Sequence, residues 1–201
     1  MTGDGKIQRD QGNFNRRLIQ LLEQLQVSYA IGGSVAAMIY SEPRSTIDID
    51  LMMQADLPII ELVVNAIEKW EVYVDPLETI IEFNLPSQLP INVMDGTIGV
   101  KADIYIARSV GFDQSAMSRK QRKQLYRNPD FDAWFLSPED VILYKLDYFR
   151  QSEGVSQKHP IDIAKMLGVI GDQLDFDYLD HWARELSVLD LWHALLQEFR
   201  K

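Results

Sequence analysis

Cysteine is absent from the 201-residue chain, and histidine occurs only three times. The lack of cysteine excludes a disulfide scaffold, a zinc site built on thiolates and a cysteine nucleophile, and it fits a reducing compartment. His159, His181 and His193 lie far along the chain from the acidic motifs described below. A histidine-based nucleophile relay is therefore not expected. His181 and His193 stand among tryptophans in apolar segments, which predicts that they are packing residues.

The chain also lacks long apolar runs, visible repeats and low-complexity segments. No run approaches the roughly 20 residues needed to span a bilayer, and the polar N-terminus has no apolar signal-peptide core. We therefore expect a cytoplasmic protein with no membrane partner. Hydrophobic residues make up 46% of the chain and charged residues 25%, which is ordinary for a globular protein. The length allows one sizeable domain, with or without a helical appendage.

Negative charge exceeds positive charge, with 30 acidic and 20 basic side chains and a net charge of -10. Such a field disfavours nonspecific binding of DNA or RNA, because phosphates are repelled unless a local basic patch dominates. One basic cluster stands out, formed by Arg119, Lys120, Arg122, Lys123 and Arg127. This cluster is either a solvated helix face or a patch for a triphosphate or a nucleic acid acceptor.

Hydrophobic periodicity predicts an α/β (α+β) fold with a mixed sheet flanked by helices, followed by a helical C-terminal region. Residues 1–12 are expected to be a loose tail. The predicted helices are 14–25, 35–40, 57–70, 137–150, 160–168, 175–185 and 187–200. The predicted strands are 27–31, 47–53, 72–74, 80–83, 91–94, 100–107 and 131–136. Ser137 suits an N-cap before Pro138, so we divide the chain into a core (1–136) and a helical region (137–201).

A glycine-serine turn, Gly32-Gly33-Ser34, joins the first predicted strand to a short helix. Glycine permits positive φ and lets a ligand approach the backbone closely. Ser34 suits a helix N-cap, and free N–H groups at such a helix start attract phosphate oxygens. The alternative is an ordinary strand-to-helix turn without a ligand.

Acidic residues alternate with apolar residues in the strand that follows the turn and in one later strand. Asp48 and Asp50 fall on one strand face, opposite their apolar neighbours, and two carboxylates so placed can converge on one divalent cation. Asp103 lies on the polar face of the predicted strand 100–107 and could be a third ligand. Asp95 is a rival, but it precedes a glycine in a probable turn. The alternative is a surface strand with a solvated acidic face.

These motifs together resemble the DNA polymerase β-type nucleotidyltransferase superfamily. The resemblance rests on Gly33-Ser34, the D-x-D motif of Asp48 and Asp50, and the later Asp103. Two further patterns resemble the AbiEii-like group, which includes toxins of type IV toxin–antitoxin pairs. They are R-x-T-x-D-x-D from Arg44 to Asp50 and S-P-E-D-x-x-x-x-K from Ser137 to Lys145.

The resemblance implies a nucleotidyltransferase that moves a nucleoside monophosphate from an NTP to a hydroxyl of RNA, protein or a small molecule. The implied catalytic residues and Mg2+ ligands are Asp48, Asp50 and Asp103. The implied nucleotide-binding residues are Gly32, Gly33, Ser34, Arg44, Thr46 and Lys145. Lys145 could instead be a helix lysine that extends to solvent. The resemblance also allows an antitoxin-like protein partner, and the alternative function is a catalytically silent nucleotide- or partner-binding module on the same fold.

Overall fold

The computed structural model describes residues 3–44, 46–125 and 131–200, with side chains from residue 11 onward. Within these residues, seven strands form one mixed sheet in the order β3-β4-β5-β2-β1-β7-β6. The strands are β1 (Ser28–Ile31), β2 (Asp48–Gln54), β3 (Tyr73–Val74), β4 (Ile91–Asp95), β5 (Val100–Ile106), β6 (Gln121–Gln124) and β7 (Asp132–Phe135). Strand β2 pairs in parallel with β5 and antiparallel with β1.

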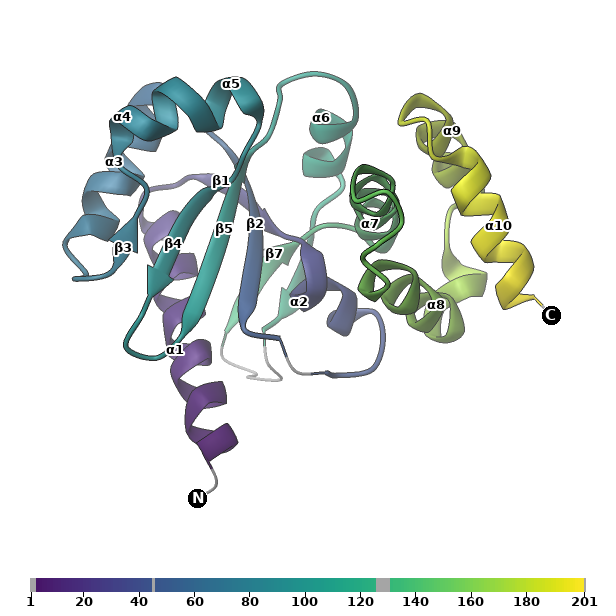
Figure 1. The fold of residues 1–201 in the computed structure, drawn as a ribbon, viewed down its shortest axis with the longest axis horizontal. Helices are drawn as coiled ribbons and strands as arrows, with labels where there is room; N and C mark the ends of the chain where they lie inside the picture. The colour runs from purple at the N-terminus through teal and green to yellow at the C-terminus, as the bar shows by residue number, and fades with distance from the viewer. Residues whose placement is uncertain (1–2, 45, 126–130, 201) are drawn as a thin grey trace.

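Helices flank this sheet and then continue beyond it toward the C-terminus (Figure 1). The core contains α1 (Gly3–Gln24), α2 (Gly33–Ile39), α3 (Leu57–Glu68), α4 (Leu77–Thr79), the π-helical turn η1 (Ile80–Asn84), α5 (Leu85–Ser87) and α6 (Gly111–Ser118). The C-terminal region contains α7 (Pro138–Gln151), α8 (Lys158–Ile170), the 3-10 turn η2 (Gly171–Gln173), α9 (Phe176–Glu185) and α10 (Leu189–Phe199). Among the described residues, no helix has the length and apolar character needed to cross a membrane.

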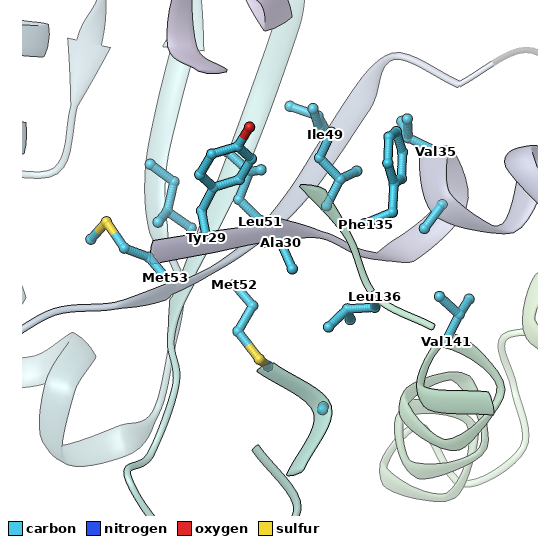
Figure 2. Packing of buried hydrophobic residues seen from close by; sticks show 14 of the residues in the cluster. Tyr29, Ala30, Val35, Ile49, Leu51, Met52, Met53, Phe135, Leu136 and Val141 are labelled. Carbon is cyan, nitrogen blue, oxygen red and sulfur yellow. The ribbon is translucent and has the colours of Figure 1, made fainter. Parts of the chain in front are cut away.

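The hydrophobic core holds α2 and α7 against the middle of the sheet. Figure 2 shows buried side chains from β1, β2 and β7 together with Val35 of α2 and Val141 of α7. Ile49 and Leu51 of β2 are almost fully buried, at 0% and 1% exposure. Because side chains alternate along a strand, burying these two residues turns the intervening Asp50 to the opposite face. Core packing therefore sets which way the acidic pair points.

The start of α7 confirms the predicted cap. Ser137 is the N-cap, and its hydroxyl accepts a hydrogen bond from the backbone N–H of Asp140 at 3.2 Å. Pro138 occupies the first turn, where it has no hydrogen-bonding cost. The position of this cap fixes the direction in which α7 leaves β7 and passes α2.

Two backbone predictions were wrong. Residues 80–83 form part of the π-helical turn η1 rather than a strand. Ile80 is buried, whereas the next three residues, Ile81, Glu82 and Phe83, are all exposed. Strand alternation does not produce three consecutive exposed side chains. Residues 3–12 belong to helix α1 rather than to a tail. They include no proline, and extending an existing helix is far easier than starting one.

Two side-chain predictions also need correction. The basic residues of 121–124 lie on strand β6, which pairs antiparallel with β7, and not on a helix; Arg127 lies outside the described residues. His181 and His193 are exposed rather than packed inside. His181 meets the edge of the Trp182 ring, and His193 Nε2 lies 3.2 Å from Asp180. The neighbouring tryptophans are the packed residues: Trp192 is fully buried, and Trp182 is partly buried against the core.

Candidate nucleotide and metal site

Three acids meet on one face of the sheet, on the neighbouring strands β2 and β5. Asp50 of β2 is paired directly with Asp103 of β5, and Asp48 precedes Asp50 on the same face. Paired residues on adjacent strands lie about 5 Å apart across the ladder and point the same way. The structure therefore places on one face of two adjacent strands the three acids that the sequence singled out.

Asp50 occupies the most demanding electrostatic position of the three. Burial and the nearby charge of Asp103 raise the pKa of Asp50 above its ordinary value of 3.8. The charges of Lys145 and Lys158 act in the opposite direction. A carboxylate whose ionised form is disfavoured in this way is stabilised by a cation placed beside it.

The glycine turn packs directly against Asp50. The Gly32 N–H donates a hydrogen bond to the Asp50 carbonyl at 2.9 Å. Gly33 has a φ of +57°, and a Cβ built there would stand 1.7 Å from Asp50 Oδ2. Both the backbone conformation and the space therefore require glycine at position 33. This close approach connects the predicted phosphate turn with the predicted metal ligand.

Ser34 does not cap helix α2, contrary to the prediction. Gly32 is the N-cap residue, and no side chain caps this end. The Ser34 hydroxyl instead accepts a hydrogen bond of 2.5 Å from Arg44 Nη2. The Thr46 hydroxyl donates to the Asp48 carbonyl at 3.3 Å. The loop between α2 and β2 is thus tied to both the glycine turn and the acidic strand.

Asp162 of α8 binds Arg44 and Lys145, the two basic side chains predicted to contact phosphate, although no sequence motif marks it. Its carboxylate accepts from Arg44 Nε at 3.0 Å and Nη2 at 2.9 Å, and from Lys145 Nζ at 2.7 Å. Burial alone would raise the pKa of Asp162, but these hydrogen bonds lower it. Asp162 is separated from Arg44 by 118 residues, so no local motif reveals the contact.

Aromatic residues and a histidine lie next to this ion-pair network. Tyr148 of α7 forms a hydrogen bond with Tyr105 of β5 and stacks on the ring of His159, with the centroids 6.2 Å apart. Burial and the charges of Lys145 and Lys158 lower the pKa of His159 to about 4. His159 is therefore neutral at physiological pH. This histidine, distant from the acids in sequence, is electrostatically coupled to the same lysine as Asp50.

The donor set suits a hard divalent cation in its chemistry. Carboxylate oxygens are the ligands that Mg2+ prefers, and a cation would offset both burial and the charge of Asp103, which raise the pKa of Asp50. Within the described residues, no three acidic or histidine side chains are already grouped at metal-binding geometry. Lys101 Nζ lies 2.8 Å from Asp103 Oδ1 and supplies part of the compensating charge.

The remaining candidates have local partners. Asp95 accepts hydrogen bonds from the Thr97 N–H at 2.9 Å and hydroxyl at 2.6 Å, which confirms its role in a turn. In the basic cluster, Arg119 pairs with Glu139 and Arg122 pairs with Glu23. These contacts account for much of the local positive charge without a ligand.

No family model matches the sequence, and no curated protein matches it either. Several solved structures match in three dimensions. The solution structure of the antibiotic-resistance factor ANT(2'')-Ia has a TM-score of 0.63 at 14% identity, covering 92% of this chain and 98% of that chain. Its crystal structure in complex with adenylyl-2''-tobramycin has a TM-score of 0.62 at 13% identity, covering 89% and 97%.

A second similar structure is that of the lincosamide antibiotic adenylyltransferase LnuA, with lincomycin bound. Its TM-score is 0.54 at 14% identity, and the match covers 76% of this chain and 94% of LnuA. At such identities the similarity establishes the fold. The predicted mixed sheet flanked by helices is confirmed, and the chain has a nucleotidyltransferase fold.

Proposed function

We propose that this protein is a metal-dependent nucleotidyltransferase that moves a nucleoside monophosphate from an NTP to a hydroxyl group. The observation that carries the proposal is the direct pairing of Asp50 with Asp103, with the Gly33 backbone held against the Asp50 carboxylate. If the acidic strand were only a solvated surface, there would be no reason for the glycine turn to lie so close to Asp50 that a Cβ at position 33 would clash with its carboxylate. The similarity in fold to ANT(2'')-Ia and LnuA supports the same reading.

Asp48, Asp50 and Asp103 would hold Mg2+ in this proposal. When bound, Mg2+ supplies Lewis-acid stabilisation of the negative charge on the phosphoryl oxygens. Asp50 is the ligand with most to gain from a cation, since burial and Asp103 disfavour its ionised form. Asp103 would in addition orient the acceptor hydroxyl and take up its proton.

The nucleotide would be held by the glycine turn and by the cations that Asp162 fixes. Lys145 is buried against Asp162, so it is not a helix lysine that extends to solvent, and it is within electrostatic range of Asp50. Arg44 joins Ser34 to Asp162 and so positions the turn. The residues proposed to contact the nucleotide are Gly32, Gly33, Ser34, Arg44, Thr46 and Lys145.

For the acceptor, we propose first a small hydroxyl-bearing molecule. The matched structures include one with an adenylylated antibiotic and one with a bound antibiotic, and this chain covers 97% and 94% of their lengths. The net charge of -10 also disfavours a nucleic acid acceptor. Membership of the AbiEii-like group, with an antitoxin-like partner, remains a proposal that rests on the sequence patterns around Arg44 and Lys145.

The test is a label-transfer screen with each of the four α-32P-NTPs and Mg2+. Acceptors are tobramycin, lincomycin, tRNA and the protein itself. We expect label on one acceptor class and none with EDTA or with Asp48→Asn combined with Asp50→Asn. Asp95→Asn, which alters only a surface turn, is the matched control and should transfer at the wild-type rate.

The same screen separates the proposal from the silent-module alternative. A silent module would bind an NTP or a protein partner without transferring label, and its binding would survive loss of the acids. Unchanged transfer by the double Asp variant would show that these carboxylates are not the catalytic centre. NTP binding without transfer to any acceptor would favour the silent module.

A further inference from the structure

Lys101 is a basic residue placed within the acidic face of the sheet. It lies two residues before Asp103 on β5, on the same face, and is paired directly with Asp48 of β2. Its ammonium group is 2.8 Å from Asp103 Oδ1. The four side chains of Asp48, Asp50, Lys101 and Asp103 therefore form a two-by-two arrangement on adjacent strands, with three negative charges and one positive charge.

Negatively charged side chains surround Lys101. The Lys101 ammonium forms an ion pair with Asp103, and the charges of Asp48 and Asp50 also favour its protonated form. About a third of the Lys101 side chain is exposed, compared with 15% for Asp103. The ammonium group therefore lies at the cluster, but its partly exposed and flexible four-carbon side chain allows it to move.

We propose that the Lys101 ammonium is the resident counter-ion of the acid cluster, which weakens binding of a bare divalent cation and couples metal binding to nucleotide binding. A divalent cation entering alone must compete with this positive charge for Asp103. A triphosphate arriving with the metal supplies oxygens to which Lys101 can transfer. This inference rests on the proposed function, since it assigns the same acids to the metal.

A structural role for Lys101 is the competing explanation. An exposed or half-exposed ion pair between neighbours on one strand contributes little to stability, typically about 0–1 kcal/mol. A purely structural pair would change the stability of β5 when removed but would leave the affinity for a metal ion unchanged or weaker. Metal affinity is therefore the measurement that separates the two roles.

The experiment measures Mn2+ binding by calorimetry, first alone and then with a nonhydrolysable NTP analogue. We expect Lys101→Met to bind bare Mn2+ about tenfold more tightly than wild type, within the usual range of coupling between sites. The analogue should then improve Mn2+ affinity less in the variant than in wild type. Lys69→Met removes the same charge from an exposed helix end and should leave both affinities unchanged.

Further variants keep the outcome interpretable. Lys101→Gln retains a hydrogen-bond donor for Asp103 and replaces Lys101→Met if that variant does not fold. Lys101→Arg retains the charge and should behave like wild type. Unchanged or weaker binding of bare Mn2+ by the neutral variants overturns the inference alone, provided that wild type binds Mn2+ with the analogue. Absence of that binding in every protein overturns the proposed function as well.

Discussion

At the scale of single residues, Asp50 is expected to serve metal binding while its ionised form lowers the stability of the fold. Its carboxylate faces the Gly33 backbone on one side and Asp103 on the other. Since both burial and Asp103 raise the pKa of Asp50, its ionised form is less favourable in the folded protein than in the unfolded chain. A metal-binding role would explain why an acid occupies a position where a neutral side chain would be more stable.

Asp50→Asn should therefore stabilise the protein while abolishing label transfer. The folded pKa lies above the ordinary value of 3.8, so the folded state loses stability as pH rises from 3.8 through the folded pKa. At neutral pH the variant avoids the free-energy cost of an ionised, buried carboxylate beside Asp103. A gain of about 1 kcal/mol would raise the melting temperature of a protein of this size by about 2–4 °C.

Asp95→Asn provides a control of opposite sign. Hydrogen bonds from Thr97 lower the pKa of Asp95, so its ionised form is favoured and its neutralisation should not stabilise the fold. Thermal unfolding in EDTA at pH 7 compares the two variants. A fall in melting temperature for Asp50→Asn would contradict the account of Asp50 as a destabilising acid.

His159 should make the protein sensitive to mild acid. Its pKa is about 4 in the folded state, lowered from 6.5 by burial and by the charges of Lys145, Lys158 and Arg44, although Asp162 acts in the opposite direction. Because the unfolded chain binds the proton more tightly, the stability that neutral His159 contributes is fully present above pH 6.5. This contribution is lost as pH falls toward 4.

Urea unfolding at pH 7 and pH 5 measures this effect. The loss of unfolding free energy between the two values should be smaller in His159→Gln than in wild type, by about 1 kcal/mol after allowance for solvent screening. His181→Gln, at an exposed position, should leave the loss unchanged. An equal loss in wild type and His159→Gln would show that His159 is not responsible.

Residue patterns predicted that the three acids lie on one face of the sheet, but they did not predict which residues contact the acids. Asp48, Asp50 and Asp103 could be found because strand alternation is a local property of the sequence. Asp162 could not, because its contact with Arg44 joins α8 to a loop 118 residues away. His159 could not, because its contact with Tyr148 depends on how α8 folds back against the preceding helix α7. Lys101 was visible beside Asp103, but its significance depends on the register between β2 and β5.

At the scale of elements, Asp162 fastens α8 to α7 and to the loop after α2. Asp162 and Lys145 are each only 4% exposed, and Lys145 Nζ is 2.7 Å from the carboxylate. Asp162→Asn should cost about 3–5 kcal/mol, because it leaves a buried ammonium without its charge partner. The decrease in urea midpoint, with the slope of the transition unchanged, measures this cost.

A double variant separates the cost of an unpaired charge from the value of the pair itself. Lys145→Met with Asp162→Leu replaces the buried ions by apolar groups and should recover most of the lost stability. It should not recover NTP binding, since Lys145 is proposed to contact the triphosphate. A double variant as unstable as Asp162→Asn would mean that the pair is irreplaceable for folding.

Element boundaries were predicted where the sequence carries a physical stop or start signal. Ser137 and Pro138 mark the start of α7 because a side-chain cap and a proline act locally. Residues 80–83 misled because short apolar runs fit either a strand or a buried turn of helix, and only tertiary packing decides between them. The predicted boundary between the tail and the first helix was wrong for a related reason, because helix α1 extends back to Gly3 without a local start signal.

At the scale of the whole molecule, a polar network joins the C-terminal helix α9 to α7 and α6. Tyr178 of α9 donates to Asp140 of α7 at 2.7 Å, and its hydroxyl lies 3.0 Å from Ser115 of α6. The guanidinium of Arg119 stacks over the Tyr178 ring at 3.9 Å. Burial raises the pKa of Asp140, so its contact with Tyr178 lies in a weakly solvated place where hydrogen bonds matter most.

Tyr178→Phe should therefore weaken the whole protein rather than release the region 137–201 alone. The variant keeps the ring beneath Arg119 but removes the hydroxyl that satisfies Asp140, at a cost of about 1–3 kcal/mol. Tyr73→Phe is the matched control, because its hydroxyl bonds to Asp75 from an exposed position; it should cost less.

Urea unfolding of Tyr178→Phe, followed by far-UV circular dichroism and by tryptophan fluorescence, tests this cooperativity. Trp182 and Trp192 report on the C-terminal helices, and Trp70 and Trp134 report on the core. We expect both signals to shift together to a lower midpoint, because the shared hydrogen bonds make separation of the two regions costly. Two separate transitions would instead identify the helices after Ser137 as an independently unfolding domain, whose movement could then open the site around Lys145 and Asp162.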